Sequence, residues 1–195
     1  MPTIRKPSDV SNARDPVRVD ADSDKYGGLV SLPMIRVRNR QRLRRKEVAD
    51  YAASLEAAYG CAVFLPDAHV DLAEAGPFRV LLADAQAVVL LENGRPLLTV
   101  RGVLTYKPTR RYVTVDMGAV RFIYNGADVM APGIVEADPG IAVGDFVWVR
   151  DERNFRALAV GEALTTGVEM GTLEKGKSVR SIQHVGDDLW SLDEA

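Results

Sequence analysis

Short apolar runs separated by turn residues fill most of the chain after Leu29, and this pattern limits it to folds rich in antiparallel strands. Three such runs follow one another closely, at residues 78–82, 87–91 and 97–100. Asn93 and Gly94 join the last two runs, and this dipeptide favours the two-residue turn of a β-hairpin because both positions need a positive φ. The middle of the chain therefore predicts a small antiparallel sheet.

A longer stretch, at about residues 39–59, has helical rather than strand periodicity. Its apolar side chains recur every three or four residues, which predicts a helix with one buried face. These side chains are Val48, Tyr51, Ala52, Leu55 and Tyr59. Gly60 is suited to end the helix, because the residue after a helix often adopts a left-handed conformation. Helix and sheet together predict an α+β domain over residues 29–111, which begins with a short extended stretch at residues 30–34.

The second half of the chain predicts a small β-barrel that carries one short helix. From Tyr112 onward, short strands recur about every ten residues, with Gly or Asp at the turns. The expected strands are residues 113–115, 129–130, 134–135, 146–149, 157–160, 178–185 and 189–190, with residues 168–173 either strand or loop. Residues 117–124 are the expected helix, which Asn125 and Gly126 would end. The side chains expected in the core of this domain are Ala119, Phe122, Ile123 and Trp190.

Residues 1–28 are rich in Asp, Arg, Ser and Pro and show no apolar periodicity, which predicts a disordered leader ending at Gly27 and Gly28. They lack the apolar run of a signal peptide. The single cysteine, Cys61, cannot form an intramolecular disulfide, which favours a reducing compartment. No run approaches the ~20 apolar residues that span a bilayer. These observations predict a cytoplasmic protein without a membrane partner.

The formal net charge of −2 conceals an uneven distribution. Residues 29–112 carry thirteen basic and eight acidic side chains, whereas residues 113–195 carry seven basic and fourteen acidic ones. The first part contains seven cations within eleven residues and no acid between them: Arg36, Arg38, Arg40, Arg42, Arg44, Arg45 and Lys46. Several of these would lie at the N-terminus of the predicted helix, where the helix dipole disfavours positive charge. This placement indicates a phosphate-binding surface, with a merely solvated face as the alternative.

Residues 115–134, VDMGAVRFIYNGADVMAPGI, contain six Gly or Ala residues around one short helix. Small side chains let the backbone lie close to another backbone or to a ligand. A strand, a helix opened by Gly118 and closed by residues 125–127, and the segment 129–134 follow in an order that resembles the opening segment of a PUA domain, an RNA-binding module. The resemblance extends over about residues 112–192. Further matching segments are Val-Gly-Asp at residues 143–145 and Ala-Val-Gly at residues 159–161.

Two other segments narrow this resemblance. Tyr-Lys-Pro-Thr at residues 106–109 and the stretch 176–190, which ends in Gly-Asp-Asp-Leu-Trp, are similar to the malignant T-cell amplified sequence family and its archaeal relatives. Those proteins pair a pre-PUA domain with a PUA domain, which implies a pre-PUA domain at residues 29–111 and a PUA domain at residues 112–192. Eukaryotic members work with density-regulated protein on the small ribosomal subunit. The resemblance thus implies a protein that binds structured rRNA or tRNA in translation, on the small ribosomal subunit and with a protein partner.

The resemblance also places an RNA groove along the short helix and the strand after it. It implies that backbone N–H groups at Gly126 and Ala127 are free to meet phosphate oxygens, and that Asn125 contacts a base edge or a ribose hydroxyl. The alternative is that the glycines only allow the helix to pack on the barrel. The expected groove residues are Arg121, Asn125, Gly126, Ala127, Met130, Lys177 and Arg180. The expected phosphate contacts of the basic stretch are Arg40, Arg42, Arg44, Arg45 and Lys46.

Neither a catalytic site nor a metal or cofactor site is expected. One cysteine and two histidines cannot make a Cys/His zinc site, and the Gly-containing segment at residues 167–171 lacks the Lys-Ser/Thr of a phosphate loop. His69 and His184 have no nucleophile or second metal ligand beside them in the sequence. We therefore expect a protein that is not an enzyme. Two alternative functions stay open: an accessory subunit that presents RNA to a modification enzyme, and an adaptor whose acidic barrel binds a basic protein.

Overall fold

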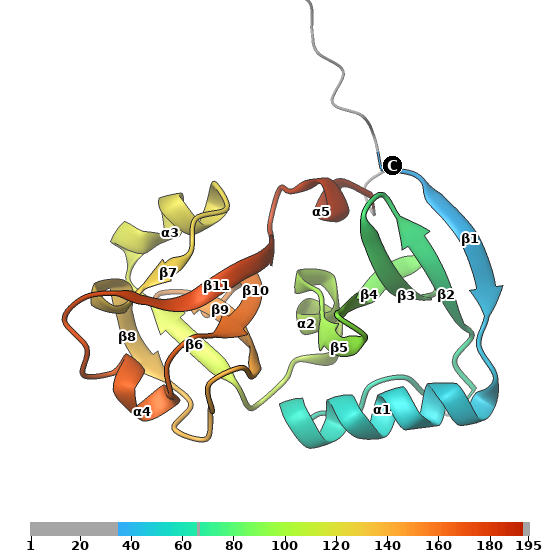
Figure 1. Ribbon diagram of the computed structural model, residues 1–195, viewed down its shortest axis with the longest axis horizontal. Helices are drawn as coiled ribbons and strands as arrows, with labels where there is room; N and C mark the ends of the chain where they lie inside the picture. Colours follow the sequence, from blue (N-terminus) through green and yellow to red (C-terminus); the bar gives the residue numbers. More distant parts are fainter. Residues whose placement is uncertain (1–34, 66, 193–195) are drawn as a thin grey trace, which may run out of the picture. The chain divides into compact units, whose positions relative to one another are not determined.

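The computed structural model describes residues 35–65 and 67–192, which belong to a compact unit spanning Pro33–Ala195. Two sheets, with helices beside them, make up this part of the chain (Figure 1). The leader predicted at residues 1–28 and the extended stretch predicted at residues 30–34 lie outside the described residues. No helix in the described ranges is long and apolar enough to cross a membrane.

The first sheet has five antiparallel strands in the order β1-β2-β3-β4-β5. They are β1 (Val37–Arg42), β2 (Val70–Ala75), β3 (Phe78–Ala83), β4 (Gln86–Glu92) and β5 (Arg95–Leu98). The helix α1 (Arg45–Tyr59) precedes β2, and α2 (Val100–Tyr106) follows β5. The predicted hairpin between β4 and β5 is confirmed, because Asn93 and Gly94 have φ values of 52° and 77°. Gly60 ends α1 as predicted, with a left-handed φ of 67°.

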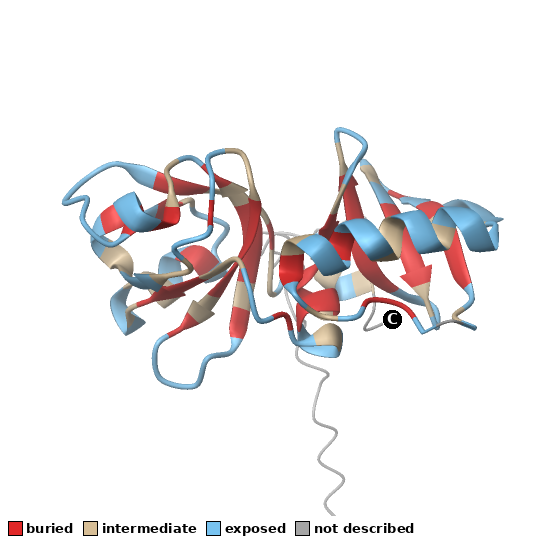
Figure 2. Cartoon of the chain, turned by 90° about the horizontal axis from the view of Figure 1, so that it is seen from below, coloured by how far each residue is buried: buried red, intermediate tan, exposed pale blue. Residues whose placement is uncertain are grey.

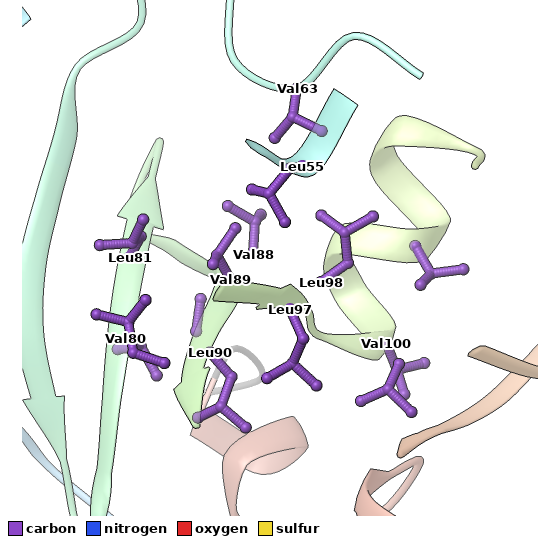
Figure 3. Packing of buried hydrophobic residues seen from close by; sticks show 14 of the residues in the cluster. Leu55, Val63, Val80, Leu81, Val88, Val89, Leu90, Leu97, Leu98 and Val100 are labelled. Carbon is purple, nitrogen blue, oxygen red and sulfur yellow. The ribbon is translucent and has the colours of Figure 1, made fainter. Parts of the chain in front are cut away.

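The core of this half lies between the strands and α1. Leu55 and Tyr59 are the buried side chains of α1. Figure 3 shows Leu55 and Val63 on one side of Val88 and Leu98, within the same buried cluster. In Figure 2 the buried positions concentrate on the strands, while the long helix α1 shows a mostly exposed surface. The continuous apolar run of β4 follows from this arrangement, since a strand covered on both faces buries consecutive residues.

The start of α1 differs from the prediction. The helix begins at Arg45 rather than near Asn39, and Arg40 and Arg42 lie in the strand β1. Arginines at alternate positions have the period of two that is typical of a strand. β1 pairs with β2 so that Arg42 stands opposite Asp71, and the Asp71 carboxylate accepts hydrogen bonds from both Arg40 and Arg42. A partner distant in the sequence therefore outweighs the local helical signal.

Besides β1, two elements of the first half have no counterpart in the prediction, namely β2 and α2. The strand expected at residues 97–100 ends at Leu98, and a helix begins directly after it. Thr99 explains this change because its hydroxyl accepts a hydrogen bond from the backbone N–H of Gly102 at 3.0 Å. Such a side chain satisfies a helix N–H group that would otherwise lack a partner.

The second sheet has six strands in the order β7-β11-β10-β9-β6-β8 and forms the predicted barrel. The β6 and β9 strands are parallel, and the other pairs are antiparallel. The strands are β6 (Tyr112–Val115), β7 (Val129–Met130), β8 (Ile134–Ala137), β9 (Phe146–Asp151), β10 (Ala157–Ala163) and β11 (Lys177–His184). The helices are α3 (Met117–Tyr124), η1 (Ala131–Gly133), α4 (Gly167–Met170) and α5 (Asp188–Leu192). The valines Val113, Val115, Val147 and Val149 fill the buried cluster of the barrel.

The helix predicted at residues 117–124 is confirmed as α3. Residues 168–173, expected as strand or loop, instead begin within the short helix α4, where Thr166 and Glu169 form a capping box. Residues 189–190, expected as a closing strand, lie in α5. The carboxylate of Asp187 accepts a hydrogen bond from the N–H of Trp190 at 2.7 Å, which favours the helical turn.

One of the four side chains expected in the core of the barrel domain lies elsewhere. Ile123 is buried and Ala119 is half-buried against the barrel cluster, but Phe122 is 53% exposed. Trp190 is half-buried and packs against the buried cluster that contains Leu189, and the guanidinium carbon of Arg101 lies 4.0 Å from its ring centroid. Its neighbour Leu189 takes the buried position, because α5 directs only one of the two side chains inward.

Candidate nucleic-acid interface

A groove of about 730 Å³ lies along α3, β7 and η1. Both apolar side chains, such as Phe122 and Met130, and charged side chains, such as Arg121 and Lys177, line it. Figure 1 shows α3 beside β7, with β11 next to it. Its lining residues include Asp116, Gly118, Arg121, Phe122, Ala127, Asp128, Met130, Gly133 and Lys177.

The position of α3 in this groove is fixed at its first turn. Asp116 lies between β6 and α3, and its carboxylate accepts a hydrogen bond from the N–H of Ala119 at 2.8 Å. Ala119 and Ile123, one helical turn apart, face the barrel. Because this pair takes the inner face, Phe122 projects from the helix and lines the groove.

Two large apolar side chains are exposed in the groove. Phe122 is 53% exposed, and Met130 on β7 is 46% exposed. The guanidinium carbon of Arg121 lies 4.6 Å from the Phe122 ring centroid, a cation–π contact. An exposed aromatic ring with a cation beside it can stack a nucleic-acid base.

The charged margin of the groove contains an ion pair. Lys177 on β11 lies 2.9 Å from the carboxylate of Asp128. The hydrogen bond from Lys177 and a second one from the N–H of Ser181 hold the pKa of Asp128 below its usual range. Asp128 is therefore ionised at neutral pH, and a phosphate that approached Lys177 would have to compete with it.

Gly118 and Gly133 are the glycines of the groove. A Cβ atom at Gly133 would lie 3.0 Å from the Cβ of Ala119, so this glycine serves the packing of α3 on η1. A Cβ atom at Gly118 would meet only the Asp116 carboxylate, at 3.1 Å. Gly118 is thus the position where a ligand can approach the backbone closely.

The role expected for Gly126 and Ala127 is wrong in one respect. Their backbone N–H groups are not free, since Gly126 donates to the carbonyl of Ile123 at 2.9 Å and Ala127 to that of Phe122 at 3.0 Å. Gly126 has a φ of 80°, and a Cβ atom there would lie 2.9 Å from Nε2 of His184. The packing alternative therefore accounts for Gly126, while Ala127 lines the groove.

The structure brings together four of the seven predicted groove residues: Arg121, Ala127, Met130 and Lys177. Asn125, Gly126 and Arg180 do not line this groove. The amide of Asn125 donates to the carbonyl of Arg121 at 2.9 Å. Arg180 lies 2.8 Å from Glu162 and 3.4 Å from Glu92, and Glu162 in particular raises the pKa of its guanidinium.

Nine of the thirteen lining residues were not among the predicted contacts, and Gly118 and Phe122 are two of these nine. Phe122 was assigned to the core because its apolar character fits either side of α3. The charged neighbour Arg121 was the sequence signal that could have indicated exposure of Phe122. A side chain next to an exposed cation on a helix lies near the edge between its buried side and its solvent-facing side.

The basic stretch is divided between two elements. Arg40 and Arg42 on β1 both hold Asp71, which is 3% exposed, and the hydrogen bond from Arg42 is the main reason that the pKa of Asp71 is lowered. Arg44, Arg45 and Lys46 are exposed at the start of α1. Because Asp71 offsets part of the charge on β1, the start of α1 carries the larger share of the free positive charge.

No cluster of three His, Cys, Asp or Glu side chains suited to a metal ion occurs among residues 35–65 and 67–192. Nδ1 of His69 lies 2.9 Å from the guanidinium of Arg42, and Nδ1 of His184 lies 3.0 Å from the carbonyl of Val185. His69 thus contacts a side chain of β1, and His184 contacts the backbone of the next residue.

The comparison with known proteins agrees with this architecture. The PUA domain family matches residues 111–185. An uncharacterised protein of Methanocaldococcus jannaschii is 34% identical over 158 residues, which cover 80% of this chain and 98% of the relative. The crystal structure of a hypothetical protein from Pyrococcus horikoshii superposes with a TM-score of 0.70 at 33% identity, over 78% of this chain and 98% of that one. The chain belongs to the PUA-domain family.

Some eukaryotic relatives of this PUA protein have a name connected with translation. Translation machinery-associated protein 20 of Saccharomyces cerevisiae is 38% identical over 41% of this chain and 48% of its own length. Malignant T-cell-amplified sequence 2 of the mouse is 26% identical over 60% of this chain and 71% of its own length. This PUA protein is thus an archaeal-type relative of the malignant T-cell-amplified sequence proteins, and the predicted α+β half followed by a PUA barrel is confirmed.

Proposed function

We propose that this protein binds structured RNA in translation, on the small ribosomal subunit, through the groove along α3 and β7. The observation that carries the proposal is that exposed Phe122 and Met130 share one groove with the cations Arg121 and Lys177. Stacked bases need an apolar face, and the phosphates beside them need positive charge. This groove offers both within one turn of α3 and the neighbouring strands.

Each side chain has a distinct part in this proposal. Phe122 stacks on a base, and the guanidinium of Arg121 adds a cation next to the same ring. Met130 fills the space beside the base, because its unbranched chain adapts to irregular surfaces. Lys177 exchanges the carboxylate of Asp128 for a phosphate oxygen. Gly118 lets the sugar–phosphate backbone approach α3.

The basic side chains at the start of α1 provide a second, sequence-independent contribution. Arg44, Arg45 and Lys46 are exposed and attract phosphates at long range. In this proposal Arg40 and Arg42 contribute less, since both are engaged by Asp71. Asn125 and Arg180 act from outside the groove, if RNA extends beyond it, and Arg180 would first have to leave Glu162.

The names of the relatives support a role in translation, and the family resemblance supports the small subunit as the site of action. We infer that the protein acts in the cytoplasm and that its role is binding rather than catalysis. The contacts of His69 with Arg42 and of His184 with Val185 support a binding role, because the Nδ1 atom of each histidine lies against a guanidinium or a backbone carbonyl rather than a nucleophile.

The first prediction tests the groove. Fluorescence anisotropy with labelled fragments of small-subunit ribosomal RNA should show that Phe122→Ala weakens binding about tenfold, since a stacked base contributes ~1–3 kcal/mol. Val135→Ala is the matched control, because Val135 on β8 is 52% exposed and lies outside the groove. The control should bind as the wild type does. Equal affinity of the Phe122→Ala protein would overturn the groove as the RNA site.

Sedimentation of a cell lysate tests the assignment to the small subunit. The protein should comigrate with small-subunit particles, and ribonuclease should release it. Comigration with an RNA-modification enzyme would favour an accessory subunit instead. A complex that survives ribonuclease would favour a protein adaptor.

A further inference from the structure

The PUA barrel presents an exposed aromatic side chain away from the groove. Among the aromatic residues that the structure describes, three are exposed: Phe122 and Tyr124 on α3, and Phe155 in the turn between β9 and β10. The first two belong to the helix of the candidate groove. Phe155 is 55% exposed and has no place in the function proposed above. A single exposed aromatic ring is common on protein surfaces, so the case for a ligand rests on what surrounds this ring.

The turn holds Phe155 in a fixed and strained position. Its φ is 54°, in the left-handed region that aromatic residues rarely adopt. The carboxylate of Asp151, 4% exposed, accepts hydrogen bonds from the backbone N–H groups of Arg153 (3.0 Å), Asn154 (2.6 Å) and Arg156 (3.0 Å). Burial alone would raise the pKa of Asp151, but these three donors lower it. Strained residues held by their surroundings concentrate at binding sites.

A fixed guanidinium lies beside the ring. The guanidinium carbon of Arg150 is 4.8 Å from the ring centroid of Phe155 and 4.1 Å from that of Tyr112. Nε of Arg150 donates to the hydroxyl of Thr114 at 2.9 Å, and its terminal nitrogen lies 3.5 Å from Glu136. These contacts hold Arg150 in place, so it supports Phe155 without covering the exposed part of the ring.

Two further cations lie next to Phe155 in the chain. Arg153 and Arg156 are exposed, and neither side chain forms an ion pair within the described part of the chain. The neighbouring acids are engaged elsewhere: Glu152 accepts a hydrogen bond from the N–H of Met117 at 3.1 Å, and Asp151 is buried. Residues 150–156 carry three arginines and two acids, a net charge of +1, in a half of the protein with twice as many acidic as basic residues.

We infer that this surface, formed by Arg150, Arg153, Phe155 and Arg156 and here termed the Phe155 turn, is a second RNA contact that stacks one unpaired base on Phe155. Arg153 and Arg156 bind the phosphates on either side of that base. The pairing of an exposed phenylalanine with a guanidinium repeats the Phe122–Arg121 pair of the groove, where the distance is 4.6 Å. The inference rests on the proposed function because its ligand is also RNA, but it concerns a separate surface.

RNA fits this surface better than an acidic peptide does. A peptide carboxylate would satisfy the arginines but would leave the ring of Phe155 uncovered. A nucleotide supplies both a flat base for the ring and a phosphate for each arginine. Single-stranded segments in particular have bases free to stack.

The test uses the full chain and a fluorescein-labelled oligouridylate of ~12 nucleotides, with anisotropy measured over a salt series. Phe155→Gly should weaken binding about tenfold, while its melting temperature stays equal or rises because glycine accepts a positive φ. Phe155→Trp, which keeps an aromatic face, should bind within about twofold of the wild type.

The double variant Arg153→Ala/Arg156→Ala should lower the salt slope of binding by about 1.4. Arg79→Ala on β3 is the exposed-arginine control, and it should leave the salt slope unchanged.

The outcomes separate this inference from the proposed function. Wild-type affinity of Phe155→Gly, together with weakened binding of Phe122→Ala, would overturn the Phe155 turn as an RNA site and leave the groove in place. Wild-type affinity of both variants, or no binding of RNA by the wild type, would overturn both proposals. Loss of a protein complex by Phe155→Gly, with RNA affinity unchanged, would identify the turn as a protein contact and overturn the inference.

Discussion

At the scale of single residues, the fold gives carboxylate partners to cations that have no acidic neighbour in the sequence. Arg40 and Arg42 lie in a stretch of cations that no acid interrupts, yet in the fold the Asp71 carboxylate contacts both of them. Lys177 and Arg180 are likewise paired, with Asp128 and Glu162. A cation that already has a carboxylate partner gains less from a phosphate than a free one does, because the old contact must be broken first.

Asp71 gives a prediction for stability as a function of pH. Its pKa is lowered from 3.8, chiefly by the hydrogen bond from Arg42, so its ionised form stabilises the fold. This contribution is present above its ordinary pKa and is lost as the pH falls through the lowered value. Asp71→Asn should reduce the free energy of unfolding by about 1 kcal/mol at pH 7, a value kept small because both arginines are half-exposed. Urea titrations should show this difference shrinking as the pH falls below 3.8 and through the lowered pKa, and a difference that does not shrink would mean that packing rather than charge is lost.

At the scale of elements, local signals were sufficient where the responsible residues are neighbours in the chain. Asn93 and Gly94 were sufficient to predict the β4–β5 hairpin, and Gly60 was sufficient to predict the end of α1. The strand β1 could not be predicted in this way, because its pairing with β2 depends on residues far along the chain. The exposure of Phe122 could not be predicted from its neighbours either, since only the packing of α3 on the barrel decides which side chain faces inward.

The first turn of α3 gives a prediction at this scale, because Asp116 both caps the helix and lines the groove. Asp116→Ala should lower the free energy of unfolding by about 1 kcal/mol, since the N–H of Ala119 loses its side-chain acceptor and keeps only the Asp116 carbonyl at 3.2 Å. Asp116→Asn should retain the cap, as asparagine is an equally good N-cap residue. The Asp116→Asn protein should also bind RNA more tightly, because the substitution removes a negative charge from the groove. Chemical denaturation and anisotropy on the same two proteins test both points; tighter binding by neither variant would place the phosphates away from Asp116.

At the scale of the whole molecule, positive and negative charge are segregated. Residues 29–112 hold thirteen basic and eight acidic side chains, and residues 113–195 hold seven and fourteen. The apolar groove and the Phe155 turn both belong to the acidic half, whereas the exposed cations of the basic stretch belong to the other. In the function proposed above, the basic stretch supplies long-range attraction, and the groove supplies the contacts with bases.

A comparison of two sets of basic residues tests this division. The variant Arg44→Ala/Arg45→Ala/Lys46→Ala should reduce the salt slope of RNA binding by about 2 to 3 and weaken every RNA to a similar extent, because phosphate contacts carry no sequence information. Its melting temperature should not fall, since positive charge at a helix N-terminus is unfavourable. Arg40→Ala/Arg42→Ala is the matched comparison: it should destabilise the fold by leaving Asp71 buried without its partners, while the salt slope falls by less than 1. Equal salt slopes for the wild type and the triple variant would remove the start of α1 from the RNA-binding surface and leave it as a solvated charged face.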